Sequence, residues 1–183
     1  PIDRWLVERT NATVREASRL LDQYEIGLAR KVVDDLFWKD LCDNYIEIAK
    51  ERLYEPDIHG VEERKSAQAA IYCLLNVLKL YSIYIPHLTE YIYQKGLREF
   101  VGVTSIHQTL WPEVEAVDEE LLEFGEQLKD AVSLMRKYKS ENNLSMRAEV
   151  DEFVVDGSKK FEAWFQATEK DLYACSHAKN VIF

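Results

Sequence analysis

The sequence contains few cysteines, and their spacing narrows the class of protein. The three cysteines, Cys42, Cys73 and Cys175, are far apart, odd in number and form no Cys-x-x-Cys pair. This pattern argues against a disulfide framework or a cysteine zinc site and favours a reducing compartment. Long apolar runs are also missing, since none approaches the roughly 20 residues that cross a bilayer. We therefore expect a cytoplasmic protein without a membrane partner.

Sequence motifs for enzyme chemistry are lacking as well. The six glycines are scattered, and none lies in Gly-x-Gly-x-x-Gly or Gly-x-x-x-x-Gly-Lys-Ser/Thr, the loops that hold nucleotide phosphates. Neither Gly-x-Ser-x-Gly nor His-Glu-x-x-His occurs. The four histidines are isolated and are expected to make ordinary hydrogen bonds: His59, His87, His107 and His177. We expect no catalytic, cofactor-binding or metal-binding residues in this sequence.

Four aspartates crowd one predicted helix: Asp34, Asp35, Asp40 and Asp43. Carboxylate bundles that hold two metal ions pair such residues with Glu-x-x-His motifs on facing helices. No helix of this sequence offers that motif, so we interpret the four aspartates as a solvated helix face.

The net charge is −10, which on its face disfavours a nucleic-acid partner. Most of the acidity is local, because residues 113–130 hold eight acidic side chains and one lysine. A basic stretch overlaps the end of this acidic run and continues beyond it, formed by Lys129, Arg136, Lys137, Lys139 and Arg147. Such a stretch can hold a phosphate backbone. It can equally be a helix C-terminus enriched in cations that the helix dipole stabilises. The residues alone leave both interpretations open.

Helical periodicity dominates the first 140 residues, which predicts a mainly α antiparallel helical bundle. Helices are expected over about 3–22, 25–53, 61–81 and 118–140, with a short one after the break at Pro86. The long second helix carries a buried stripe that includes Leu36, Leu41 and Tyr45, and Trp38, Cys42 and Ile46 extend it sideways. Residues 54–60 are expected to form a loop and 96–112 to be irregular, with Ser105–His107 extended.

The pattern changes after Asn142-Asn143. Residues 148–156 alternate and are β-branched, 159–173 are helical, and 180–183 form a second apolar strand. This order predicts a small C-terminal βαβ appendage. We therefore divide the chain into a bundle (1–112), a linking acidic-to-basic helix (113–147) and a small α/β subdomain (148–183). A start without Met and an apolar end suggest a piece of a longer polypeptide.

Four ordered segments carry a family resemblance. The segment from Trp38 through Cys42-Asp43-Asn44-Tyr45-Ile46-Glu47 resembles the Trp-x-x-Phe-Cys-Asp-Trp-Tyr-Ile-Glu pattern of the anticodon-binding domain of valyl-tRNA synthetases. The same order of motifs continues in three other segments: Asp3-Arg4-Trp5-Leu6, residues 66–94 with the Ile85-Pro86-His87 break, and residues 105–113 with Trp111-Pro112-Glu113. Departures are Asn44 for the usual tryptophan, Leu41 for phenylalanine, and Tyr93 for a residue that is often tryptophan.

The resemblance implies recognition of the anticodon loop of valine tRNA, supporting attachment of valine to that tRNA. Ile46, with Asn44 and Tyr45 beside it, is the first candidate for contact with anticodon bases, although Tyr45 is more readily a core residue. Contacts to the RNA backbone are implied for four basic residues: Arg136, Lys137, Lys139 and Arg147. The other implied partner is the rest of the same synthetase chain. ATP and Mg²⁺ are expected only in a catalytic domain outside this sequence, and the protein is expected to be a monomer.

Two alternatives stay open. The first is the same domain of an isoleucyl- or leucyl-tRNA synthetase, although the isoleucyl counterpart usually carries Trp-Tyr-x-Arg-Arg where this sequence has Cys-Asp-x-Tyr-Ile-Glu. The second is a helical protein-interaction scaffold without RNA activity, which the net acidity favours.

Overall fold

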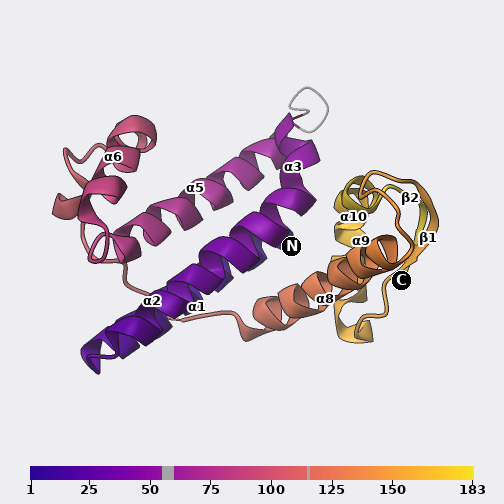
Figure 1. The fold of residues 1–183 in the computed structure, drawn as a ribbon, viewed down its shortest axis with the longest axis horizontal. Helices are drawn as coiled ribbons and strands as arrows, with labels where there is room; N and C mark the ends of the chain where they lie inside the picture. The colour runs from indigo at the N-terminus through magenta and orange to yellow at the C-terminus, as the bar shows by residue number, and fades with distance from the viewer. Residues whose placement is uncertain (55–59, 115) are drawn as a thin grey trace. The chain divides into compact units, whose positions relative to one another are not determined.

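The computed structural model describes residues 1–54, 60–114 and 116–183 and is mainly helical, as predicted (Figure 1). The helices are α1 (Ile2–Asp22), α2 (Ile26–Asp34), α3 (Glu47–Tyr54), α5 (Val61–Tyr81), α6 (Pro86–Gly96), α7 (Arg98–Val101), α8 (Glu119–Glu141), α9 (Glu162–Ala167) and α10 (Glu169–Ser176). A π-helical segment, η1 (Asp35–Ile46), joins α2 to α3, and short 3₁₀ turns are η2 (Ile106–Gln108) and η3 (Lys159–Phe161). Two strands follow α8: β1 (Val150–Val154) and β2 (Ala178–Ile182).

The chain divides into two compact units. Unit 1 comprises Pro1–Trp5, Asn44–Ser66 and Asp118–Phe183, and unit 2 comprises Leu6–Asp43 and Ala67–Val117. The division that we drew at residues 112 and 147 stays a prediction, and these units divide the chain at other places. No helix within the described ranges combines the length and the apolar character needed to cross a membrane.

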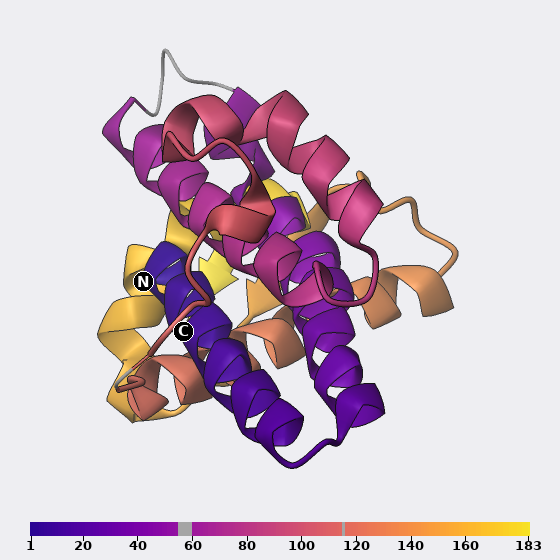
Figure 2. The ribbon, with the colours of Figure 1, turned by 90° about the vertical axis from the view of Figure 1, so that its left-hand side faces the viewer.

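In unit 2, α1 and α2 form a helical hairpin (Figure 2). The amide of Glu25 donates to the carbonyl of Leu20 across the turn. Tyr24 has a left-handed backbone (φ 60°) and an 88% exposed side chain. Tyr24 lies outside the periodicity of the first helix, because α1 ends at Asp22.

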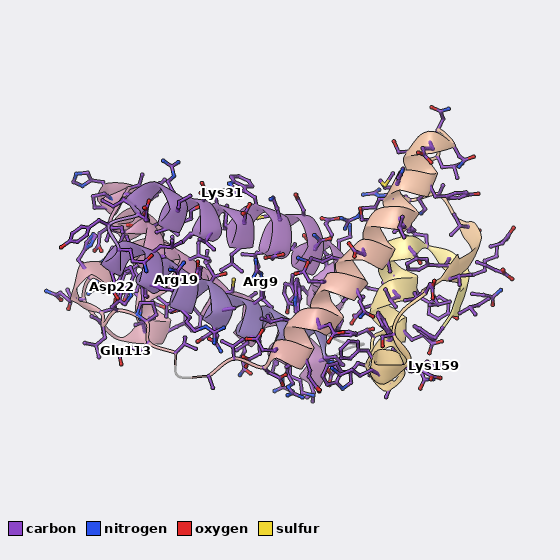
Figure 3. All side chains as sticks on the ribbon, turned by 90° about the horizontal axis from the view of Figure 1, so that it is seen from below. Arg9, Arg19, Asp22, Lys31, Glu113 and Lys159 are labelled. Atoms are coloured by element: carbon purple, nitrogen blue, oxygen red, sulfur yellow. The ribbon has the colours of Figure 1, made fainter. Side chains whose placement is uncertain are left out.

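Polar contacts join the helices of unit 2. Arg9 Nε of α1 lies 2.6 Å from Asp40 Oδ2, and Asp40 is only 2% exposed (Figure 3). On α5, the Tyr72 hydroxyl donates to Asn11 Oδ1 at 2.7 Å and the Tyr81 hydroxyl donates to Asp34. Asp40 is therefore a buried partner of Arg9, and its assignment to a solvated face is wrong.

The long second helix runs without a break from Ile26 to Tyr54, close to the predicted bounds, but residues 35–46 are wound as a π-helix. Hydrogen bonds from residue i to i+5 widen each turn. Leu36 and Leu41, five residues apart, are accordingly both buried. Trp38 is 59% exposed and Ile46 is 37% exposed, so these two residues do not extend the buried stripe sideways as expected.

Helix α5 buries two faces in unit 2. Ala69, Cys73 and Val77 lie on the most buried face. The neighbouring face packs against other residues of the unit as well. Leu78 forms a cluster with Tyr93, Leu97 and Ile106, and partly buried Ile71, Leu74 and Leu75 pack against it.

Pro86 is the first residue of α6, and the chain after α7 is fixed by polar contacts with that helix. Glu90 Oε2 accepts hydrogen bonds from Ser105 Oγ (2.9 Å) and from the Ile106 amide (3.0 Å). Ser105 has an extended backbone and caps the 3₁₀ turn η2. The expectation of extended structure is therefore wrong for Ile106 and His107, because Glu90 and the Ser105 cap favour a turn there.

Unit 1 is built on α8. Asp118 caps this helix by accepting from the amides of Glu120 (3.1 Å) and Leu121 (3.2 Å). Its aromatic core residue Phe124 contacts three rings of the C-terminal segment, at centroid distances of 5.1 to 6.0 Å: Phe161, Trp164 and Phe165. A Cβ on Gly125 would lie 1.8 Å from Trp5 Nε1, so only glycine permits this approach of α8 to the first turn of α1.

The C-terminal segment of unit 1 has the predicted βαβ order. Strands β1 and β2 pair in parallel, with Val150 opposite Ala178 and Val154 opposite Ile182. The helix predicted over 159–173 is divided into η3, α9 and α10 and continues to Ser176. Residues 55–59 of the predicted loop at 54–60, which include His59, lie outside the described residues.

Candidate nucleic-acid interface

A small cleft in unit 1 contains two of the four basic residues that the sequence points to, Arg136 and Arg147. Its volume is about 130 Å³, and its lining residues are Glu47, Lys50, Met135, Arg136, Met146, Arg147, Cys175 and His177. They come from α3, the last turns of α8, the loop after α8 and the junction of α10 with β2. Three arginine or lysine side chains and one histidine thus face a single glutamate. We name this site the basic cleft.

Asn44 and Arg136 meet at the edge of the basic cleft. Arg136 Nη1 donates to Asn44 Oδ1 at 3.3 Å, across 92 residues of sequence, and both side chains are half-buried. At the start of α3, Lys50 Nζ lies 2.8 Å from Glu47 Oε2. The structure therefore brings a predicted base-contacting residue and a predicted backbone-contacting residue together.

Ile46 and Tyr45 have opposite environments. Ile46 is exposed, whereas Tyr45 is fully buried, with its hydroxyl 2.7 Å from Asp3 Oδ1 and 3.1 Å from the Ser66 carbonyl oxygen. Burial, followed by the charge of Asp3, raises the pKa of the Tyr45 hydroxyl well above its ordinary value. Tyr45 is therefore a core residue, which is the interpretation that the sequence analysis favoured, and it cannot contact RNA in this conformation.

A buried ion cluster fixes the elements behind Tyr45. Arg52 Nη1 of α3 donates to Asp3 Oδ2 at 2.9 Å, and Arg52 Nε lies 2.8 Å from Asp171 Oδ1 of α10. The second contact is close but poorly aligned for a hydrogen bond, so we describe it as an ion pair. Burial is the main cause that raises the pKa of Asp171 to about 6, against the opposing effect of Arg52. Sequence patterns did not indicate this cluster.

Lys139 is not a surface residue. Its side chain is 0% exposed, and Nζ donates to the carbonyl oxygens of Met146 (2.9 Å), Ala148 (2.8 Å) and Ser176 (2.6 Å). Burial lowers the pKa of the Lys139 ammonium. The prediction that Lys139 contacts an RNA phosphate is therefore corrected, because all three N–H donors are used inside the protein.

The other two predicted backbone contacts are exposed. Arg147 lies in the loop after α8 and lines the basic cleft. Lys137 lies on α8 outside the lining of the cleft, with Nζ 3.9 Å from Glu141 Oε1. Arg147 thus shares a site with Arg136, whereas Lys137 does not.

Three cleft residues were missed by the sequence analysis: Lys50, Cys175 and His177. His177 has a left-handed backbone (φ 53°) where α10 ends and β2 begins. Burial raises the pKa of the Cys175 thiol to about 12, so it stays protonated. No local pattern marks these residues, because Lys50 comes from α3 whereas Cys175 and His177 come from the end of α10.

Unit 2 has a hollow of a different kind, which we name the apolar groove. Its volume is about 320 Å³, and α2, η1, α5 and α6 line it, with Ile85 between the last two. The lining residues are Arg30, Asp34, Phe37, Trp38, Leu74, Val77, Leu78, Tyr81, Ile85, Leu88, Thr89 and Ile92.

Comparison with known proteins agrees with the resemblance seen in the sequence. A family model described as the anticodon-binding domain of tRNA ligase matches residues 3–154, most of the chain. The chain belongs to this family. The anticodon-binding domain is similar to valine–tRNA ligases of Thermococcus kodakarensis (33% identity, 94% of this chain, 19% of the relative) and Methanopyrus kandleri (32%, 99% and 20%). A valine–tRNA ligase of a Wolbachia from Brugia malayi is 28% identical over 98% of this chain.

The anticodon-binding domain spans about a fifth of the length of these curated relatives. The family match contains Asn44, Ile46, Arg136 and Arg147. It ends within β1, so Cys175 and His177, which complete the basic cleft, lie beyond the matched region.

Proposed function

We propose that this domain binds the anticodon stem-loop of valine tRNA, as the RNA-recognising part of a valine–tRNA ligase. In the proposal, ATP- and Mg²⁺-dependent attachment of valine takes place in a catalytic domain outside this sequence. The names of the relatives support valine, and the family supports anticodon binding. A monomeric, cytoplasmic protein is part of the proposal, consistent with three free cysteines.

The basic cleft is the observation that carries the proposal. Neutralising phosphates supplies most of the affinity of proteins for nucleic acids, and Lys50, Arg136 and Arg147 provide charge for it. The overall charge of −10 does not oppose this, because most of the acidity lies in residues 113–130. Backbone contacts of this kind position the RNA but do not select its sequence.

Base selection is assigned to Asn44 and Ile46. Anticodons for valine keep adenine in the middle and cytosine third. An asparagine amide can donate to and accept from the edge of adenine, and an exposed isoleucine offers an apolar surface to an unstacked base. Both residues are accessible in part, and Asn44 already has its amide oxygen fixed by Arg136.

A binding measurement tests the proposal. The chain is titrated at low salt with a valine anticodon hairpin, with hairpins altered at the middle or third base, and with isoleucine and leucine anticodon hairpins. We expect the valine hairpin to bind tightest, with each altered base weakening binding by about 1 to 3 kcal/mol. Tighter binding of the isoleucine or leucine hairpin would assign the domain to that ligase. No RNA binding at low salt would favour the protein-interaction scaffold.

A further inference from the structure

Two residues that line the basic cleft, Arg147 and His177, share a feature of the backbone beside them. Arg147 is flanked by Met146 and Ala148, and His177 follows Ser176. The carbonyl oxygens of these three neighbours are the acceptors of the buried Lys139 ammonium. One internal cation therefore holds both segments, the one that presents Arg147 and the one that presents His177.

We propose that Lys139 is a positioning residue of the basic cleft. Its ammonium ties the loop that carries Arg147 to the junction that carries His177, and both side chains are thereby held where an RNA phosphate can meet them beside Lys50 and Arg136. The proposal rests on the proposed function for its ligand, the phosphates of the anticodon stem-loop. The tie itself is a property of the protein without RNA.

The local backbone explains why a tie is needed. Residues 142–149 form no helix or strand, and Asn143 has a left-handed conformation (φ 54°). The parallel pairing of β1 with β2 begins only after this loop, where the Val150 amide donates to the His177 carbonyl at 3.2 Å. Before that point, the three Lys139 hydrogen bonds connect the Arg147 loop to the end of α10.

The chemistry of Lys139 fits a structural tie and not a fortuitous burial. A buried ammonium is unfavourable unless every donor is satisfied, and here three donors meet three carbonyl oxygens at 2.6 to 2.9 Å. A hydrocarbon in its place would leave these buried carbonyl groups without that partner. The geometry thus couples the loss of one internal charge to the displacement of two side chains of the cleft, Arg147 and His177.

A double-mutant cycle tests the proposal. Affinity for the valine anticodon hairpin and its salt dependence are measured for Lys139→Met, for Arg147→Ala/His177→Ala, and for the triple variant. We expect Lys139→Met to weaken binding roughly tenfold and to flatten the slope of log K against log salt by about 1, the value for one lost phosphate contact. The triple variant should bind no more weakly than the double variant, since coupled residues are not additive.

Leu128→Ala is the matched control, because it opens a cavity at a buried position of the same helix without removing charge. We expect this control to lower the melting temperature but to leave the salt slope unchanged. An unchanged slope in Lys139→Met, or a further loss when Lys139→Met is added to the Arg147→Ala/His177→Ala variant, would overturn the positioning role. If Lys139→Met does not fold, Lys139→Gln, which keeps two N–H donors without the charge, enters the same cycle.

A measurement without RNA separates this proposal from the proposed function. Backbone amides at 147–148 and 177–178 should exchange with solvent roughly tenfold faster in Lys139→Met than in Leu128→Ala. If the unmodified chain does not bind the hairpin but this difference is found, the proposed function fails and the tie stands. Equal amide exchange in the two variants would show that Lys139 does not hold these two segments together.

Discussion

The basic cleft of unit 1 and the apolar groove of unit 2 are both lined by residues of the helical run from Ile26 to Tyr54. The groove takes Phe37 and Trp38 from it, and the cleft takes Glu47 and Lys50. The lining of the groove contains one arginine or lysine, Arg30, whereas the lining of the cleft contains three: Lys50, Arg136 and Arg147. One helical run thus supports two surface chemistries, because each unit packs different elements against it.

The interiors of the two units differ in the same sense. Unit 1 buries Lys139 and the Arg52–Asp171 pair, and unit 2 buries Asp40, which Arg9 reaches from a partly exposed position. Buried charge fixes geometry at the expense of desolvation. Among the described residues, unit 1 therefore bears this cost at Lys139, Arg52 and Asp171, and unit 2 bears it at Asp40.

The largest expected effect concerns this buried charge. Arg52→Met leaves Asp3 and Asp171 without their shared cation and should lower the free energy of unfolding by about 3 to 5 kcal/mol. Arg9→Met in unit 2 should cost about 1 to 2 kcal/mol, because the Arg9 side chain is 26% exposed and Asp40 keeps a further interaction when Arg9 is removed. Urea denaturation of both variants checks the difference. Equal costs would mean that the two units do not differ in their dependence on buried charge.

The pH dependence of stability sharpens the same point. The pKa of Asp171 is raised to about 6, so the folded chain binds more protons than the unfolded chain between about pH 4 and 6. The protonated Asp171 carboxyl therefore contributes its full share of stability below about pH 4, and this share is lost as the pH rises through about 6. The free energy of unfolding of the unmodified chain should fall by on the order of 2 kcal/mol over this range, and Asp171→Asn should abolish that fall. The free energy of unfolding is measured from pH 4 to 7.5 for the unmodified chain and for Asp171→Asn. Parallel curves would contradict the raised pKa of Asp171.

The sequence predicted most of the fold because local rules decide it. Helical periodicity, the Asp118 cap and the break at Pro86 lie within single segments. The errors occur where another segment intervenes: Glu90 turns residues 106–108 into a 3₁₀ helix, and the π-helical winding of residues 35–46 exposes Trp38. Periodicity assumes one helix type throughout, so it could not indicate that change.

The site was less predictable than the fold. Asn44, Ile46, Arg136 and Arg147 followed from the family resemblance, whereas spacing along a helix says which side a lysine lies on and not what packs over that side. Lys139 was therefore taken for a surface cation, although the βαβ segment covers it. Lys50 and His177 meet only through the folded chain, 127 positions apart in number, so no sequence pattern could join them.

Charge reversal of the cleft is expected to have the next largest effect. Arg136→Glu/Arg147→Glu removes two phosphate contacts, and about 0.7 released counterions for each gives a loss of roughly 25-fold in hairpin affinity at 0.1 M salt. Arg30→Glu/Arg98→Glu makes the same change of charge in unit 2 and should cost less than threefold. Titrations at several salt concentrations measure both slopes. Equal losses would show that the net charge of the chain matters and the cleft does not.

Ile46 tests base selection, with a smaller effect. Ile46→Trp enlarges an exposed side chain next to Asn44 and should reduce discrimination at the middle or third anticodon base about tenfold, or about 1.4 kcal/mol. Stability should change by less than about 0.5 kcal/mol, as for a surface substitution. An equal loss for the valine hairpin and the altered hairpins, together with unfolding, would make Ile46 a core residue.

Trp38 tests whether the apolar groove of unit 2 takes part in RNA binding, and its substitution should have the smallest effect. Its ring is 59% exposed and meets Phe37 edge to face at 4.9 Å between centroids. Trp38→Ala should therefore cost about 1 kcal/mol of stability and leave hairpin affinity unchanged within about twofold, since phosphate contacts supply most of that affinity. Unstacked bases also bind by stacking on aromatic rings. A tenfold loss of affinity in Trp38→Ala, with an unchanged salt slope, would therefore mean that an RNA base stacks on Trp38 in unit 2. RNA binding would then not be confined to the basic cleft of unit 1.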